Sequence, residues 1–167
     1  MPARDLIIFP DARLSTVAAE VATWDDALRA LAEDLLDTLR GVGALGLTAP
    51  HIGVPARLAV IRLQPDLPHT IYVNPEVVEA SPERAPQREG SVSMPGIIEP
   101  VERAVRIRVR YRDLDGAPHE EEAEGFAAAC LQHEIDQLDG IFWTERLTRL
   151  RRERAMKRYA KLRRTGG

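Results

Sequence analysis

Hydrophobic residues recur at helical spacing in the stretch from Trp24 to Arg40. Four leucines lie on one face of this stretch: Leu28, Leu31, Leu35 and Leu39. An apolar residue at every third or fourth position predicts an amphipathic helix. Asp25 and Asp26 favour a helix start, and Gly41 favours a helix end. We therefore expect a long structural helix near the N-terminus that packs on a sheet.

A second pattern, strict alternation, predicts strands. From Ala104 to Arg112, apolar residues alternate with arginines. This period of two puts the apolar side chains on one face of a strand. Asp115 favours a hairpin turn, and the acidic segment Ala117–Glu124 would return antiparallel beside the arginines. A solvated sheet face with opposed charges is therefore a better interpretation of the arginines than nucleic-acid binding.

Shorter apolar runs predict further strands. Arg57–Leu63 and Thr70–Val73 are rich in branched residues, and Asn74 with Pro75 is expected to end the second strand. The polar segment Glu83–Gln87 contains a proline and predicts a loop.

The stretch Ala127–Gly140 predicts a central helix with apolar residues on its core side. His133 and Gln137 are four residues apart and share one face, whereas Glu134 lies about 100° around the helix. This layout is that of H-E-x-x-H, in which two imidazoles hold a metal and the glutamate acts on the metal-bound water. A glutamine replaces the second histidine here. The sequence therefore holds half of a metal-binding motif.

The formal net charge of −3 is unevenly distributed over the 167 residues. Glu120–Glu124 is acidic, whereas residues 147–164 are strongly basic and predict a C-terminal surface helix that could bind a partner. Together these elements predict an α+β fold in which antiparallel sheets surround a central helix, with further helices at both ends. The length suits one domain over residues 1–167.

The single cysteine excludes an internal disulfide. The first ten residues lack the apolar core and cleavage pattern of a signal peptide, and no apolar run approaches the roughly 20 residues of a membrane span. We therefore expect a cytoplasmic protein without a membrane partner.

The glycine-rich stretch Gly41–Val54 contains His51 and has two interpretations. It could let the backbone approach a ligand that His51 contacts, or it could be a tight structural turn with an exposed histidine. It lacks the lysine of a phosphate loop and does not fit the dinucleotide fingerprint. Nucleotide binding is therefore not expected.

Three stretches taken together resemble the signature motifs of the peptide deformylases. They are GLTAPHIG at residues 46–53, EGSVSMPG at residues 89–96 and QHEIDQLDG at residues 132–140. Their order and spacing are similar to those of the family, and the resemblance covers nearly the whole chain. It implies the deformylase fold and, as the family reaction, hydrolytic removal of the formyl group from N-formylmethionyl peptides.

In that family, one cysteine and two histidines hold a divalent metal such as iron or zinc, and a glutamate moves the proton. A glutamine and a backbone N–H group stabilise the oxyanion. The resemblance places the cysteine at Ser91, the histidines at His133 and Gln137, the glutamate at Glu134, the glutamine at His51 and the backbone donor at Val92. Three of the side chains that perform the chemistry are therefore replaced.

These replacements weaken the metal site. A hydroxyl and a carboxamide are weak, neutral donors compared with a thiolate and an imidazole. They cannot supply the affinity on the order of 10 kcal/mol that is typical of structural zinc. We therefore expect no bound metal cofactor and a formyl hydrolysis that is lost or strongly reduced, so that enzyme activity is an open question.

Three alternatives could restore chemistry. His51, His133 and Glu134 could form a rebuilt metal site. Cys130 lies nearly on the face of His133 and could add a ligand, although a buried small residue is the simpler interpretation. Ser91 could act as a nucleophile with a histidine as base and Glu134 as the orienting carboxylate. Each would give a divergent amide hydrolase.

The resemblance also implies a pocket for the methionine side chain of a nascent peptide. The residues expected to bind substrate are Gly46, Gly90, Met94, Ile97, Ile98, Phe126 and Cys130. Glu89 resembles a family glutamate that pairs with an arginine, here Arg103, as scaffolding for the Ser91 strand. A non-catalytic alternative is a protein that binds the N-terminal peptide of nascent chains, or the ribosome through its basic C-terminal helix.

Overall fold

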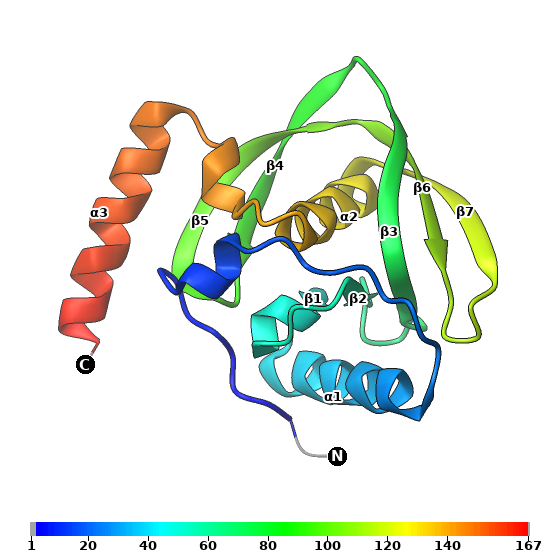
Figure 1. The fold of residues 1–167 in the computed structure, drawn as a ribbon. Coiled ribbons are helices and arrows are strands. Elements are labelled where there is room, and N and C mark those ends of the chain that lie inside the picture. Colours follow the sequence, from blue (N-terminus) through cyan, green and yellow to red (C-terminus); the bar gives the residue numbers. More distant parts are fainter. Residues whose placement is uncertain (1–2, 167) are drawn as a thin grey trace.

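A computed structural model describes residues 3–166 and has the predicted α+β architecture (Figure 1). The helices are α1 (Asp26–Val42), α2 (Gly125–Leu138) and α3 (Arg149–Thr165), with 3-10 turns at Ala12–Ser15, Ala49–Ile52 and Trp143–Arg146. The strands are β1 (Gly46–Thr48), β2 (Leu58–Ile61), β3 (Thr70–Ala80), β4 (Arg84–Ser91), β5 (Met94–Ala104), β6 (Arg106–Arg112) and β7 (Pro118–Glu124).

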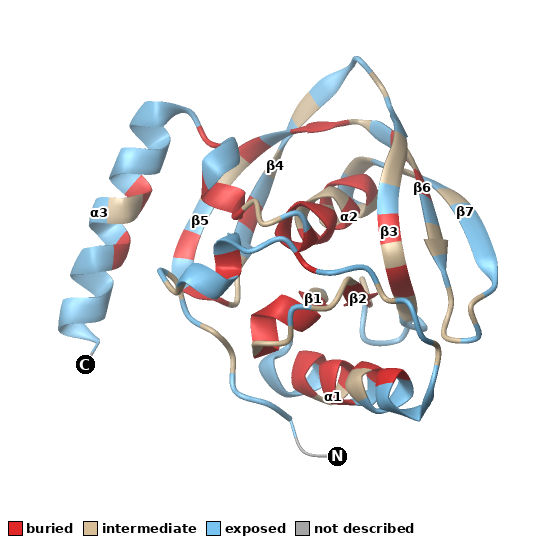
Figure 2. Cartoon of the chain, viewed as in Figure 1, coloured by how far each residue is buried: buried red, intermediate tan, exposed pale blue. Residues whose placement is uncertain are grey.

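Helix α2 lies between two antiparallel sheets (Figure 1). One sheet has five strands in the order β1-β2-β3-β6-β7, and the other is the β4-β5 hairpin. Most of α2 is buried (Figure 2), and Leu131, Ile135 and Leu138 pack with Ile107 and Val109 of β6. The central position of this helix, expected from the sequence, fixes the side chains that it carries.

The N-terminal helix forms as predicted, with shifted ends. The Asp25 carboxylate accepts a hydrogen bond of 3.0 Å from the Leu28 amide and caps α1. The helix runs past Gly41 and ends at Gly43, whose φ of 68° is a left-handed conformation that glycine adopts without strain. Its leucine face packs on β1 and β2 and contributes to a core cluster beneath the sheet.

The arginines of β6 lie on a solvated sheet face, as interpreted from the sequence. Arg108 pairs with Glu122 at 2.8 Å, and Arg110 pairs with Glu120 at 3.1 Å, across the β6-β7 ladder. These exposed pairs offset the charge of both strands.

Two strand predictions need correction. Strand β3 does not end at Asn74 but continues to Ala80, because Asn74 takes a φ of 52° and the register shifts between Val73 and Glu76. This irregularity lets the strand pass through a proline. Residues 84–87 of the predicted loop at Glu83–Gln87 instead belong to β4, where a proline is tolerated because β4 belongs to a sheet of only two strands.

Helix α3 lies at the outside of the molecule and packs on β5 (Figure 1). Thr148 caps it, and its buried residues are Ala155 and Tyr159. The Tyr159 hydroxyl donates a hydrogen bond of 2.9 Å to the Phe9 carbonyl. Among residues 3–166, no helix combines the length and the apolar character that crossing a membrane requires.

Candidate functional site

A cavity of about 180 Å³ lies where β1, β4 and α2 meet. Of the residues proposed from the sequence, those that line it are Gly46, His51, Gly90, Ser91, Val92, Phe126, Cys130, His133 and Glu134. The three sequence motifs therefore converge on one cavity, although they lie far apart along the chain.

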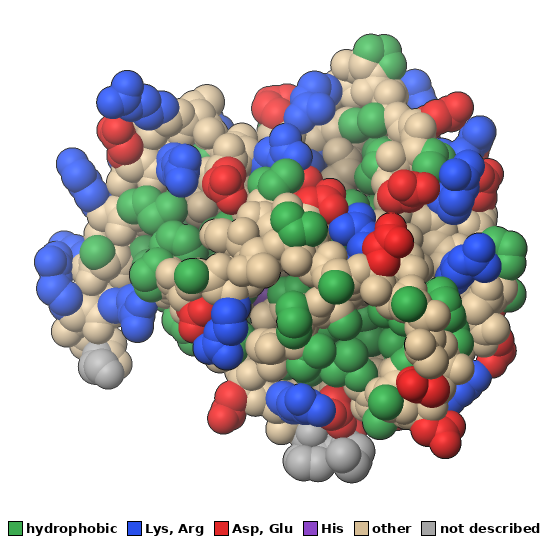
Figure 3. All heavy atoms as spheres, in the orientation of Figure 1, with side chains coloured by type: hydrophobic (Ala, Val, Ile, Leu, Met, Phe, Trp, Pro, Cys, Tyr) green, Lys and Arg blue, Asp and Glu red, His purple; other side chains and the backbone are tan. Residues whose placement is uncertain are grey.

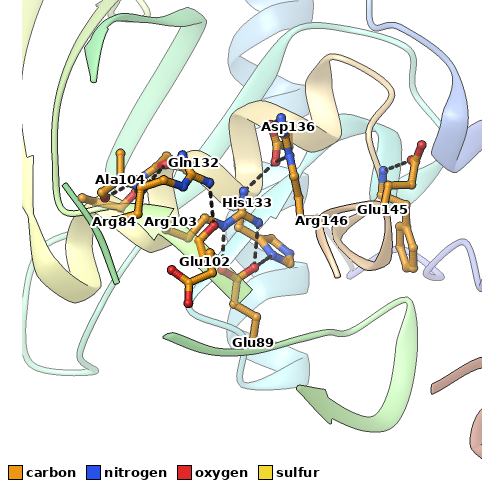
Figure 4. Close-up of polar contacts among 12 residues, drawn as sticks. Arg84, Glu89, Glu102, Arg103, Ala104, Gln132, His133, Asp136, Glu145 and Arg146 are labelled. Atoms are coloured by element: carbon orange, nitrogen blue, oxygen red, sulfur yellow. Dashed lines mark hydrogen bonds and ion pairs between the residues drawn. The ribbon is translucent and has the colours of Figure 1, made fainter. Parts of the chain in front are cut away.

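His133 is held by a buried charge network (Figure 4). Its Nδ1 atom lies 2.8 Å from Glu89 Oε1, and Arg103 donates to both oxygens of Glu89 at 2.7 and 2.8 Å. Arg103 also donates to Asp136 at 2.6 Å, and Arg146 donates to both oxygens of Asp136. The predicted pair of Glu89 and Arg103 is therefore present, within a larger network.

This network sets the charge states around His133. Burial alone would raise the pKa of Glu89, but hydrogen bonds from Arg103 and His133 outweigh burial and hold that pKa below its usual value. Burial would lower the pKa of His133, but the charges of Glu134 and Glu89 outweigh burial and raise it. Glu89 is therefore an ionised partner that fixes the ring orientation of His133.

His51 presents an N–H group that has no partner. Its Nδ1 accepts a hydrogen bond of 3.0 Å from the Thr48 amide and lies 2.8 Å from the Thr48 hydroxyl. The ring proton must therefore lie on Nε2, which is buried and unpartnered within the described residues. Burial, with a contribution from His133, lowers the pKa of His51 to about 3. At neutral pH this side chain is a neutral hydrogen-bond donor, buried and not exposed as one interpretation of the sequence required.

Glu134 presents a carboxyl oxygen without a partner. The side chain is buried, and its Oε1 atom has no hydrogen bond among residues 3–166. Burial raises the pKa of Glu134, opposed by the charge of His133 and reinforced by that of Glu89. A Cβ atom at Gly46 would come within 2.5 Å of Glu134 Oε2, so a glycine is required for the carboxyl group to reach this position.

Ser91 is not aligned as a nucleophile. Its Oγ atom accepts a hydrogen bond of 3.1 Å from the Ser93 amide. Within the described part of the chain, no hydrogen bond joins Ser91 to His51 or to His133. The structure therefore does not assemble the serine, histidine and carboxylate arrangement considered from the sequence.

Gln137 points away from the cavity. It is 2% exposed, it does not line the cavity, and its Nε2 donates a hydrogen bond of 2.7 Å to the Leu14 carbonyl. The side chain at the second histidine position therefore ties α2 to the N-terminal segment.

The donor set does not fit a tightly held divalent metal. Burial, with the charges of Glu134 and Glu89, raises the pKa of Cys130 to about 12, so this residue is a thiol and not a thiolate at neutral pH. No group of three or more His, Cys, Asp or Glu side chains in residues 3–166 is arranged to hold a metal ion. Of the positions that the resemblance assigns to metal ligands, only His133 carries a strong donor.

The apolar wall of the cavity differs from the prediction. Met94 and Ile97 are almost completely buried in a separate core cluster with Trp143, and Ile98 is exposed without lining the cavity. The reason is that β5 turns away after the hairpin and packs against α3. The lining residues that the sequence did not indicate are Ala44, Leu45, Gln87, Arg88 and Ala129. Leu45 and Arg88 each precede a motif, and this adjacency was the signal that could have identified them.

The chain is similar throughout to known deformylases. The family model of polypeptide deformylase matches residues 3–153. A "Peptide deformylase-like" protein of Brucella suis is 54% identical over 98% of this chain and 100% of its own length. A "Peptide deformylase" of the same organism is 40% identical over 97% of this chain and 94% of its own length.

A crystal structure of a peptide deformylase from Legionella pneumophila superimposes with a TM-score of 0.91 at 36% identity. It covers 98% of this chain and 97% of the other. The fold, the order of the motifs and the sequence similarity agree, and the chain belongs to the peptide deformylase family.

Proposed function

We propose that this protein binds the formylated N-terminus of a peptide in the cavity beside α2 and hydrolyses it slowly or not at all. The observation that carries this proposal is a cavity with unpartnered polar groups, together with Ser91 and Gln137 at the positions that the resemblance assigns to a cysteine and the second histidine. Ser91 accepts a hydrogen bond from a neighbouring amide, and Gln137 is bonded to a backbone carbonyl outside the cavity.

The two unpartnered groups in the cavity suit a formyl amide. A formylated amine offers one carbonyl acceptor and one N–H donor. The Nε2–H group of His51 can donate to the carbonyl, and Glu134 Oε1 can accept from the N–H group. A ligand of this kind would satisfy two buried groups that otherwise each cost about 1–3 kcal/mol.

The relatives also support a divided function. Brucella suis has both a protein named as a deformylase and a protein named as deformylase-like, and this chain is more similar to the second. A protein of the second kind can bind N-terminal peptides in the cytoplasm while another protein performs the hydrolysis.

The test measures metal content, formate release and peptide binding on the same preparation, purified without chelators. We expect metal far below one ion per chain, no chelator-sensitive formate release, and binding of N-formylmethionyl peptides. Near-stoichiometric iron, zinc or nickel with brisk formate release would instead establish a rebuilt metal site. Chelator-resistant formate release that Ser91→Ala abolishes would establish the serine route.

Restoring the family residues sharpens this test. The combination of Ser91→Cys, Gln137→His and His51→Gln should recover metal binding and formate release together. The matched control replaces Ser91→Cys with Ser93→Cys in the same combination, which puts the thiol two residues away from the family position. Equal metal uptake by both combinations would contradict the assignment of Ser91 as the lost ligand.

A second candidate role belongs to α3, which carries basic residues on its exposed side (Figure 3). Arg154, Lys157, Lys161 and Arg164 recur at helical spacing, and they have no ion pair within the described residues. A basic stripe of this kind favours an anionic partner such as the ribosome.

Reversing two charges on the helix, Lys157→Glu with Lys161→Glu, should reduce cosedimentation with ribosomes at low salt. The same charge change at Arg40 and Arg62, away from α3, should not. Equal sedimentation of both variants and the unaltered protein would exclude α3 as the binding surface.

A further inference from the structure

Arg88 is a charged side chain on the cavity wall that has no counter-ion. It lies exposed on β4, and within residues 3–166 its side chain makes no hydrogen bond or ion pair. The neighbouring Glu89 cannot neutralise it, because both oxygens of Glu89 are already bonded to Arg103 and one also to His133. Arg88 is therefore free to bind an external anion.

The cavity has a closed end and a mouth, and Arg88 lies at the mouth. The unpartnered groups of His51 and Glu134 are 1% and 5% exposed and mark the closed end, whereas Arg88, Leu45 and Phe126 are exposed and mark the mouth. A volume of about 180 Å³ is well below the roughly 300–1,000 Å³ of sites for drug-sized ligands. It holds about one amino-acid residue, so the next group of the ligand emerges at the mouth.

We propose that Arg88 determines specificity by binding a carboxylate one residue away from the formyl amide. This inference rests on the proposed function, since the amide must occupy the closed end. An arginine suits this role because its planar guanidinium can donate two parallel hydrogen bonds to one carboxylate. The preferred ligand is thus an N-formyl amino acid with a free carboxylate, or a formylated peptide with an acidic second residue.

The test compares four ligands by calorimetry at low salt. Two carry the carboxylate: N-formylmethionine and N-formylmethionyl-aspartyl amide. Two lack it: N-formylmethioninamide and N-formylmethionyl-alanyl amide. We expect at least one ligand with a carboxylate to bind roughly five- to tenfold more tightly than its neutral counterpart. The pair that shows the larger ratio identifies the source of the carboxylate.

Arg88→Gln should remove this preference, so that the charged and neutral ligands of each pair bind with equal affinity. Arg88→Lys should retain part of it, because the charge remains without the paired geometry. The matched control is Arg84→Gln on the same strand, since Arg84 is exposed, donates to the Glu102 carbonyl and does not line the cavity.

The outcomes separate the two proposals. Equal affinity for charged and neutral ligands, or a preference that persists in the Arg88→Gln variant, overturns the role of Arg88 and leaves the proposed function intact. Absence of binding by all four ligands overturns the proposed function and this inference with it.

Discussion

Two groups of polar side chains beside helix α2 differ in how they are satisfied. Arg103 and its neighbours form a closed network in which each charged group has at least one ionic partner. In contrast, His51 Nε2 and Glu134 Oε1 are buried and have no partner within the described residues. The network reaches the cavity at Glu89 and His133, so a completed scaffold adjoins an incomplete site.

This difference identifies polar groups of the cavity that lack a partner. An unpartnered buried group is unfavourable, and such groups are uncommon in folded proteins unless a ligand or water meets them. The network that orients His133 is complete, although the resemblance assigns the family's cysteine and second histidine to Ser91 and Gln137. A complete network beside unpartnered groups supports the proposal that the cavity binds a ligand.

A substitution that breaks the Arg103 network should have the largest effect on the free energy of unfolding. Arg103→Met removes the cation between Glu89 and Asp136 and leaves two buried carboxylates with fewer partners. We expect the free energy of unfolding, measured by urea denaturation, to fall by about 3–5 kcal/mol. Arg146→Met is the control because Arg146 also bonds Asp136 but is 42% exposed, and it should cost less than about 1 kcal/mol. Equal losses in both variants would show that the burial of Arg103 does not make its ion pairs more stabilising than those of the more exposed Arg146.

On the cavity side, His51 should make the free energy of unfolding depend on pH. Burial holds the pKa of His51 at about 3 in the folded protein, below the 6.5 of an unperturbed histidine. The unfolded chain therefore binds the proton first, so the stability that His51 contributes is complete above pH 6.5 and is lost as the pH falls toward 3.

His51→Gln removes this titration. Between pH 7.5 and pH 4.5, the unaltered protein should lose about 2 kcal/mol more of its free energy of unfolding than the variant does. Urea denaturation at the two pH values measures the difference. Parallel losses in both proteins would mean that His51 is not a neutral, desolvated donor.

The elements that form the scaffold could be predicted from the sequence, whereas the residues that line the cavity could be predicted only in part. The period of the apolar residues predicted α1, β6 and α2, because burial of one face decides where such elements lie. The pairing of Glu89 with Arg103 was also predicted, through the family resemblance. The extension of β3 through Asn74 and Pro75 was not, since an irregular strand depends on tertiary contacts such as those between Asn74 and Val21.

The residues that line the cavity are decided by the directions that the strands take in space, and the spacing of residues along the sequence does not give these directions. Met94 lies in the Ser91 motif and Ile97 directly follows it, yet β5 carries both into the core beneath α3. Arg88 belongs to no motif and reaches the cavity only because β4 ends beside α2. Local pattern identifies which residues can act, whereas the packing of distant elements decides which of them meet.

The smallest predicted effect concerns Gln137, which ties α2 to the N-terminal segment. Gln137 donates to the Leu14 carbonyl from a buried position. Gln137→Leu leaves that carbonyl unsatisfied and should lower the free energy of unfolding by about 1–2 kcal/mol. Gln137→His can still donate from a ring N–H group and should lower it by less. Urea denaturation of both variants tests this order. The reverse order would show that the hydrogen bond to Leu14 does not decide which side chains this position accepts, and that a histidine no longer fits beside the N-terminal segment.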